Sequence, residues 1–156
     1  MSRRAVQNLT TGVSLGSLIE QLGPLNNRWR EGKPAEKVLT LWDMGEVILR
    51  GIPDAADPLL WEIQQRSYMT RNVLRYALIV RRAWRHRGAL EKLVSNLHNF
   101  TVFREALPFL KGDREGIDEA TYWKVVSLLG VPNTSEALRY IKGLKAQKIG
   151  RQHRRA

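Results

Sequence analysis

The residues best suited to bind an anionic partner lie in one basic stretch, residues 66–87. This stretch contains seven arginines and one histidine, and no carboxylate occurs between Glu62 and Glu91. Apolar residues recur at helical spacing through the same stretch, so we expect a helix over residues 70–86 that buries one face and presents the other. Because arginine forms bidentate hydrogen bonds to phosphate and to guanine edges, the presented face is a candidate nucleic-acid contact.

Projection of this helix at about 100° per residue separates its two faces. Val80 and Trp84 lie on the apolar face, whereas Arg71, Arg75 and Arg82 fall together on the opposite side. A helix fits the DNA major groove, and the N-terminal residues of a recognition helix usually reach the bases. We therefore expect base contacts from the start of this helix and phosphate contacts around it. The candidate base readers are Thr70, Arg71, Asn72 and Arg75, and the surrounding arginines are Arg66, Arg81, Arg82 and Arg85.

Two interpretations of this basic face remain open. Either the face contacts nucleic acid, or it is a solvated surface whose arginines pair in part with acids from other helices. No acid between residues 63 and 90 offers a local partner, and the whole chain is basic. Both observations favour the contact with nucleic acid.

A second basic segment follows Glu136, the last acid of the chain. Its basic residues recur about every three positions, which spreads them around a helix and does not gather them on one face. We therefore expect a general phosphate-binding arm, with a solubilising tail as the alternative. Arg3 and Arg4 form a shorter basic arm near the N-terminus. The candidate contacts of the second segment are Lys142, Lys145, Lys148, Arg151, Arg154 and Arg155, preceded by Arg139.

Length and composition limit the class of protein. The 156 residues are 43% hydrophobic and include five tryptophans, which predicts a folded domain with tails. A net charge of +11 predicts a polyanionic partner: nucleic acid first, then an anionic membrane surface, then an acidic protein. DNA is favoured over RNA, because a helix fits the DNA major groove. The sequence has no cysteine and no apolar run of about 20 residues, and we expect no signal peptide at its N-terminus. We therefore expect a cytoplasmic protein without a membrane span.

Other chemistry is not expected from the remaining residues. The acids between residues 113 and 119 do not fit a calcium-loop spacing, and the three histidines match no metal spacing. Glu31-Gly32-Lys33 lacks the preceding aspartate of a nuclease signature, and no nucleophile–base set or phosphate loop is present. We expect no enzyme, no catalytic residue, no metal and no cofactor.

The tryptophans are expected to divide between core and surface. Trp42, Trp61, Trp84 and Trp123 fall on apolar helical faces, which predicts core packing. Trp29 lies between two arginines in a predicted loop and is a candidate for stacking on a base or a partner.

The elements that position these residues are predicted to be helices throughout, with short connections. We expect an all-α fold, a compact multi-helix bundle, with a flexible arm over residues 1–12, a single helical domain over residues 13–148 and a basic C-terminal tail over residues 149–156. A helix-turn-helix-like pair is expected around residue 69. Gly45 is expected to allow another helix to approach closely. The predicted helices cover residues 15–22, 34–51, 58–68, 70–86, 89–97, 99–110, 117–129 and 135–148, with a turn-rich connector over residues 25–34.

Residues 39–84 carry a series of motifs that resembles a known bacterial family. The series is Trp42 with Met44-Gly45-Glu46 and Ile48; then Leu59, Leu60 and Trp61; then Ser67 with Arg71-Asn72-Val73-Leu74; and then the arginine-rich residues 75–84. This order is similar to that of the N-terminal helical domain of the DUF1016/YhcG family, which precedes a PD-(D/E)XK nuclease domain.

The resemblance implies a DNA-recognition subunit in a restriction-like or anti-phage defence setting. The chain departs from the family pattern in its short proline-rich linker over residues 52–58. It also contains no nuclease signature, so any cleavage would come from a partner.

Two other classes compete with this interpretation. Small, basic, all-helical chains resemble the small subunits of CRISPR-type effector complexes, which hold nucleic acid without reading its sequence. The third class is an adaptor whose basic face binds an acidic protein. Protein partners are expected in each class, and the oligomeric state would discriminate between them: a two-fold dimer suits a palindromic site, and a row of copies suits an effector complex.

Overall fold

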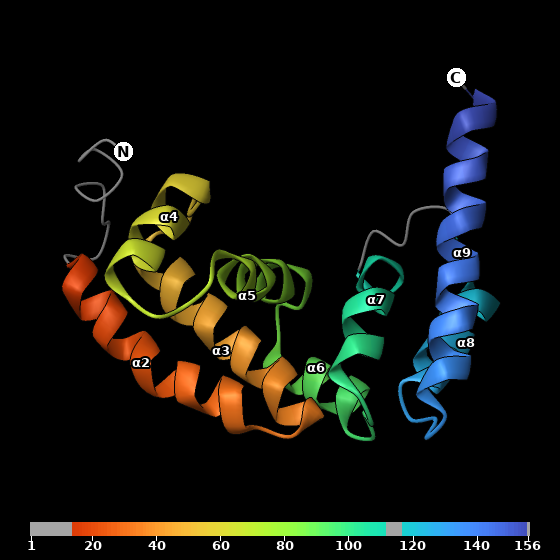
Figure 1. Ribbon diagram of the computed structural model, residues 1–156, viewed down its shortest axis with the longest axis horizontal. Helices are drawn as coiled ribbons and strands as arrows, with labels where there is room; N and C mark the ends of the chain where they lie inside the picture. The colour runs from red at the N-terminus through yellow and green to blue at the C-terminus, as the bar shows by residue number, and fades with distance from the viewer. Residues whose placement is uncertain (1–13, 112–116, 156) are drawn as a thin grey trace. The chain divides into compact units, whose positions relative to one another are not determined.

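The computed structural model describes residues 14–111 and 117–155, with side chains described up to residue 147. These ranges are all-α and contain no strand, which confirms the predicted fold class (Figure 1). The predicted arm over residues 1–12 lies outside the described residues. The helices are α2 (Leu15–Glu31), α3 (Pro34–Gly51), α4 (Asp57–Arg66), α5 (Arg71–Ala83), α6 (Arg87–Val94), α7 (Phe100–Leu110), α8 (Glu119–Leu128) and α9 (Thr134–Arg155).

The chain divides into two compact units, Met1–Arg87 and Gly88–Ala156. Buried apolar side chains occur in both units. The single domain expected over residues 13–148 stays a prediction. The last helix is longer than predicted, because α9 continues to Arg155 and not to residue 148. No helix in the described ranges combines the length and the apolar character that a bilayer crossing requires.

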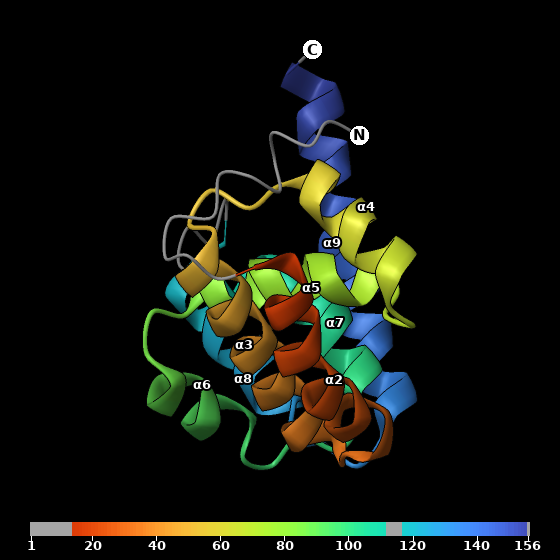
Figure 2. The same cartoon turned by 90° about the vertical axis from the view of Figure 1, so that its left-hand side faces the viewer.

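The first unit is built around α3, which packs against α2 and α5 (Figures 1 and 2). Leu41, Met44 and Ile48 of α3 and Leu74 of α5 are fully buried in this core. A Cβ atom on Gly45 would lie 2.4 Å from the carbonyl oxygen of Ala77. The missing side chain therefore allows α3 and α5 to approach closely, as predicted. The shorter helix α4 packs against α5 and α2.

The helix α2 is longer than predicted, because it continues through Gly23-Pro24 to Glu31. Proline removes one backbone hydrogen bond, and this loss is tolerated where the freed carbonyl can be solvated. The carbonyl freed by Pro24 belongs to Glu20, and both residues are exposed, whereas Leu22 on the neighbouring face is buried against the core. Packing against α3 thus overrides the local break signal, and Trp29 lies in a helix and not in the predicted loop. The Nζ of Lys37 donates to the carbonyl oxygen of Trp29 at 2.6 Å and lies 4.7 Å from the centre of its ring.

The helix α5 is shorter than predicted, because it ends at Ala83 and not at residue 86. Trp84 is the C-cap and has an extended backbone. Its carbonyl oxygen accepts a hydrogen bond of 2.8 Å from Nε1 of Trp42, on α3. This long-range contact, between residues 42 positions apart, favours the early end of α5.

The second unit packs α7 against α8 and α9. Phe103 of α7, Val125 of α8 and Ile141 of α9 are buried in its core. Asp118 begins α8 as its N-cap, with Oδ1 accepting from the backbone N–H of Thr121 at 2.7 Å.

Candidate nucleic-acid interface

The predicted helix-turn-helix-like pair corresponds to α4, a four-residue connection and α5. Thr70 is the N-cap of α5, and its Oγ1 accepts a hydrogen bond of 3.3 Å from the backbone N–H of Val73. Such a cap satisfies one of the free N–H groups of the first turn. Thr70, Arg71 and Asn72 are all exposed, so the start of α5 is accessible from solvent.

The three arginines predicted to share a face differ in their partners. Arg71 has no hydrogen-bond or ion-pair partner among the described residues, while Arg82 donates from Nη2 to the carbonyl oxygen of Ala55 at 2.9 Å. Arg75 forms a bidentate pair with Asp57, at 3.3 Å from Nε and 3.1 Å from Nη2. Of the three, therefore, only Arg75 has its charge neutralised by a described carboxylate.

The Arg75–Asp57 pair is exposed to solvent. The side chains keep 46% and 60% of their accessible surface. The Arg75 hydrogen bond and charge lower the pKa of Asp57, and the charge of Arg71 adds to this effect. The same contact raises the pKa of Arg75. Exposed pairs contribute little to stability, so a phosphate could compete with Asp57 for the Arg75 guanidinium.

An open hollow lies between the start of α4 and the middle of α5. Its volume is about 610 Å³. Arg75, Arg82 and Asp57 supply its charged lining, and the partly exposed Ile79 supplies apolar surface. The remaining lining residues are Ala55, Ala56, Pro58, Leu60 and Leu78.

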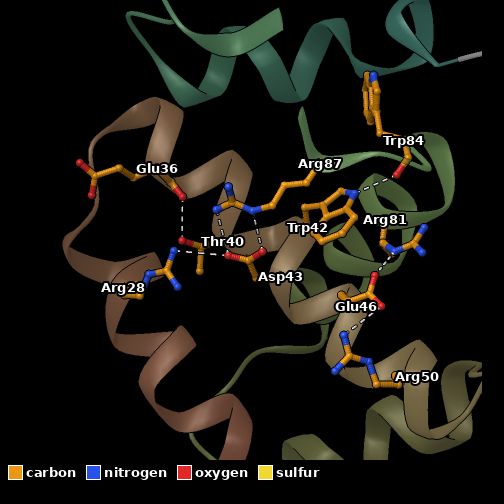
Figure 3. A network of polar contacts seen from close by, with 10 residues as sticks. All are labelled: Arg28, Glu36, Thr40, Trp42, Asp43, Glu46, Arg50, Arg81, Trp84 and Arg87. Atoms are coloured by element: carbon orange, nitrogen blue, oxygen red, sulfur yellow. Dashed lines mark hydrogen bonds and ion pairs between the residues drawn. The ribbon is translucent and has the colours of Figure 1, made fainter. Parts of the chain in front are cut away.

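Two arginines of the basic stretch belong to a structural network on α3 (Figure 3). Nε of Arg81 lies 2.6 Å from Oε2 of Glu46, and both side chains are only 25% exposed. Arg87 donates two hydrogen bonds to Asp43, at 2.9 Å and 3.2 Å. These pairs hold the end of α5 and the following turn against α3. We therefore assign Arg81, one of the predicted phosphate contacts, a structural role.

The other predicted residues of this stretch are exposed. Nε of Arg66 lies 3.8 Å from Oε2 of Glu62, in an i,i+4 ion pair on α4. Arg85 is exposed and has no ion-pair partner in the described ranges. The acids that pair with arginines of residues 66–87 thus come from α3 and α4. The interpretation of the basic face as a solvated surface expects such pairs for some of its arginines.

The second basic segment lies on α9. Lys142 is exposed, as is Arg139, whereas Lys145 forms an ion pair with Glu105 of α7 that lowers the pKa of Glu105. The pair restricts Lys145, so Arg139 and Lys142 are the accessible cations among the described side chains of this helix. The other predicted contacts, Lys148, Arg151, Arg154 and Arg155, have side chains outside the described set.

Two tryptophans predicted to pack in the core are exposed. Trp61 on α4 keeps 42% of its accessible surface and Trp123 on α8 keeps 57%. Periodicity failed here because α4 and α8 are short helices, and their buried faces are filled by leucine, isoleucine and valine. The sequence reasoning also missed Asp57, whose pairing with a residue 18 positions away leaves no spacing signal.

Among the described residues, no group of three or more histidines and acids is placed to hold a metal ion. Asp113 and Glu115 lie outside these residues.

Comparisons with protein-family models, curated proteins and solved structures gave no significant match.

Proposed function

We propose that this chain binds nucleic acid, with DNA favoured over RNA, through the start of α5. The observation that carries the proposal is the exposed Arg71, which has no hydrogen-bond or ion-pair partner among the described residues and lies one helical turn before Arg75. Arg82 continues the same face with a guanidinium bonded to a neutral carbonyl. A helix N-terminus with exposed arginines suits phosphate and base edges alike.

The mechanism begins with electrostatic capture by the net charge of +11. A phosphate then replaces Asp57 in the fork of Arg75, while Arg71 and Asn72 approach the groove. Arg81 and Arg87 hold the far end of α5 on α3, so the presented end is positioned before binding. The restriction-like or anti-phage setting rests on the resemblance described above and is part of the same proposal.

Arg71→Ala tests the contact directly. If Arg71 reads a base, the variant should lose roughly 1–3 kcal/mol on the preferred site and discriminate less between sequences. If Arg71 only holds phosphate, all sequences should weaken alike and the salt slope should fall by nearly one. Fluorescence anisotropy titrations over a salt series, with duplex DNA, single-stranded DNA and RNA, measure both quantities. Equal losses on every sequence would favour the small-subunit class over sequence reading.

Two further variants sharpen this test. Arg30→Ala removes another exposed arginine, from α2, and should leave affinity nearly unchanged beyond the general charge effect. Asp57→Asn frees Arg75 of its competitor and should strengthen binding. Absence of binding to any nucleic acid at low salt would refute the proposal and leave the adaptor class.

A further inference from the structure

The connection between α4 and α5 is held at both ends. Oγ of Ser67 donates to the carbonyl oxygen of Ile63 at 2.7 Å and accepts from the backbone N–H of Met69 at 3.2 Å. The Met69 side chain is 4% exposed and anchors the connection in the core. Thr70 then caps α5. These contacts fix the backbone on either side of Tyr68.

Tyr68 itself points into solvent, with 92% of its accessible surface exposed. Its ring and hydroxyl have no partner among the described residues. Because the ring is not buried, it contributes almost nothing to the core. An aromatic ring on a backbone that is already ordered loses little conformational entropy when a ligand covers it.

The surroundings of Tyr68 suit a nucleic-acid strand. Arg71 and Asn72 follow within four residues and are exposed. The preceding acid, Glu62, is paired with Arg66 and has a side chain only 15% exposed. A positive surface with an exposed aromatic ring is the combination by which proteins hold unpaired strands, the backbone by charge and the bases by stacking.

We propose that Tyr68 is a stacking platform for an unpaired nucleobase, so that the preferred ligand carries a single-stranded segment next to the phosphates held by Arg71. A base inside a duplex presents only its edges in the grooves, whereas an unpaired base exposes a whole face to the ring. The inference rests on the proposed function and adds the substrate class: a duplex end, a junction or a single strand.

The test compares three labelled DNA probes: a blunt duplex, the same duplex with a short unpaired extension, and the unpaired strand alone. The wild-type chain should bind the two probes with unpaired bases more tightly than the blunt duplex. Tyr68→Ala should lose roughly 5- to 100-fold on these two probes, the loss typical of one stacked base, and under about twofold on the blunt duplex. Tyr68→Phe should keep the wild-type pattern, because stacking requires the ring and not the hydroxyl.

Trp123→Ala is the matched control, since it removes another exposed aromatic ring, from the second unit, and should change no preference between probes. Unfolding midpoints equal to wild type would show that each variant folds. If the wild type binds all probes and Tyr68→Ala weakens none of them, the stacking inference is overturned while the proposed function stands. Loss of the preference in Tyr68→Phe would also overturn it. If the wild type binds no probe at low salt, both proposals fail together.

Discussion

Two arginine–carboxylate pairs made by α5 differ in burial, and this decides their roles. Glu46 and Arg81 are both 25% exposed and lie 2.6 Å apart, and the Arg81 guanidinium lies 5.0 Å from the centre of the Trp42 ring. Asp57 and Arg75 make a similar pair that is about half exposed. Removing one partner of a partly buried pair leaves the other charge poorly solvated, whereas water readily replaces an exposed partner. The first pair is therefore structural, and the second is open to exchange with a ligand.

Glu46→Gln tests the structural pair through its pH dependence. The Arg81 hydrogen bond is the largest effect on the pKa of Glu46 and holds it below its ordinary value of 4.5. A lowered folded-state pKa means that the carboxylate stabilises the fold above the unfolded-state pKa and loses this contribution as pH falls through the folded-state pKa. The variant should therefore lose about 1 kcal/mol of unfolding free energy at pH 7. That difference should shrink steadily below pH 4.5.

Urea unfolding of the wild type and the variant at pH 7 and pH 3 measures this difference. Glu20→Gln, at an exposed position of α2 with no ion-pair partner among the described residues, is the control and should change stability little at either pH. A loss of equal size at both pH values would show that the Glu46 charge is not the cause.

At the level of elements, the α3–α5 contact determines where the candidate interface lies. Gly45→Ala should be strongly destabilising, because the added Cβ would lie 2.4 Å from the Ala77 carbonyl oxygen and 2.5 Å from Cβ of Arg81. Relief requires a shift of the α5 backbone, and such overpacking costs roughly 1–3 kcal/mol, more than alanine gains as a helix former.

Gly143→Ala makes the same substitution inside α9, where a Cβ would meet nothing within 4 Å. It should stabilise the second unit by up to about 1 kcal/mol. Denaturant midpoints for both variants measure the contrast. Stability of Gly45→Ala equal to that of the wild type would show that the helices can separate without cost.

The same elements show what the sequence could predict. The bounds of α3 follow from Pro34 at its start and Gly51 at its end, and the structure has both. The bounds of α2 and α5 depend on packing against α3, and no local signal reports that packing. Likewise, periodicity places Arg71, Arg75 and Arg82 on one face of α5. Arg75 bonds to Asp57, 18 residues away, and Arg82 bonds to Ala55, 27 residues away. These contacts become visible only in the fold.

For the whole molecule, positive charge is divided between the two units. Residues 1–87 hold 14 basic and 8 acidic residues, a net +6, and residues 88–156 hold 12 and 7, a net +5, which together give the +11 of the chain. In the first unit, acids of α3 and α4 neutralise several arginines. In the second unit, Arg139 and Lys142 on α9 are exposed cations. If both units contact one nucleic acid, the second adds affinity through a high local concentration and not through sequence reading.

The double variant Arg139→Gln, Lys142→Gln tests this division in the full chain. Each phosphate contact contributes about 0.9 to the slope of log affinity against log salt, so the slope should fall by up to about two. Affinity should weaken alike for all sequences and for all three probe types, unlike the selective losses expected at Arg71 and Tyr68. Salt-dependent anisotropy titrations measure the slope, and a double variant at the exposed Arg30 and Lys33 controls for net charge. If the salt slope of the α9 variant falls no further than that of the control, the interface is restricted to the first unit.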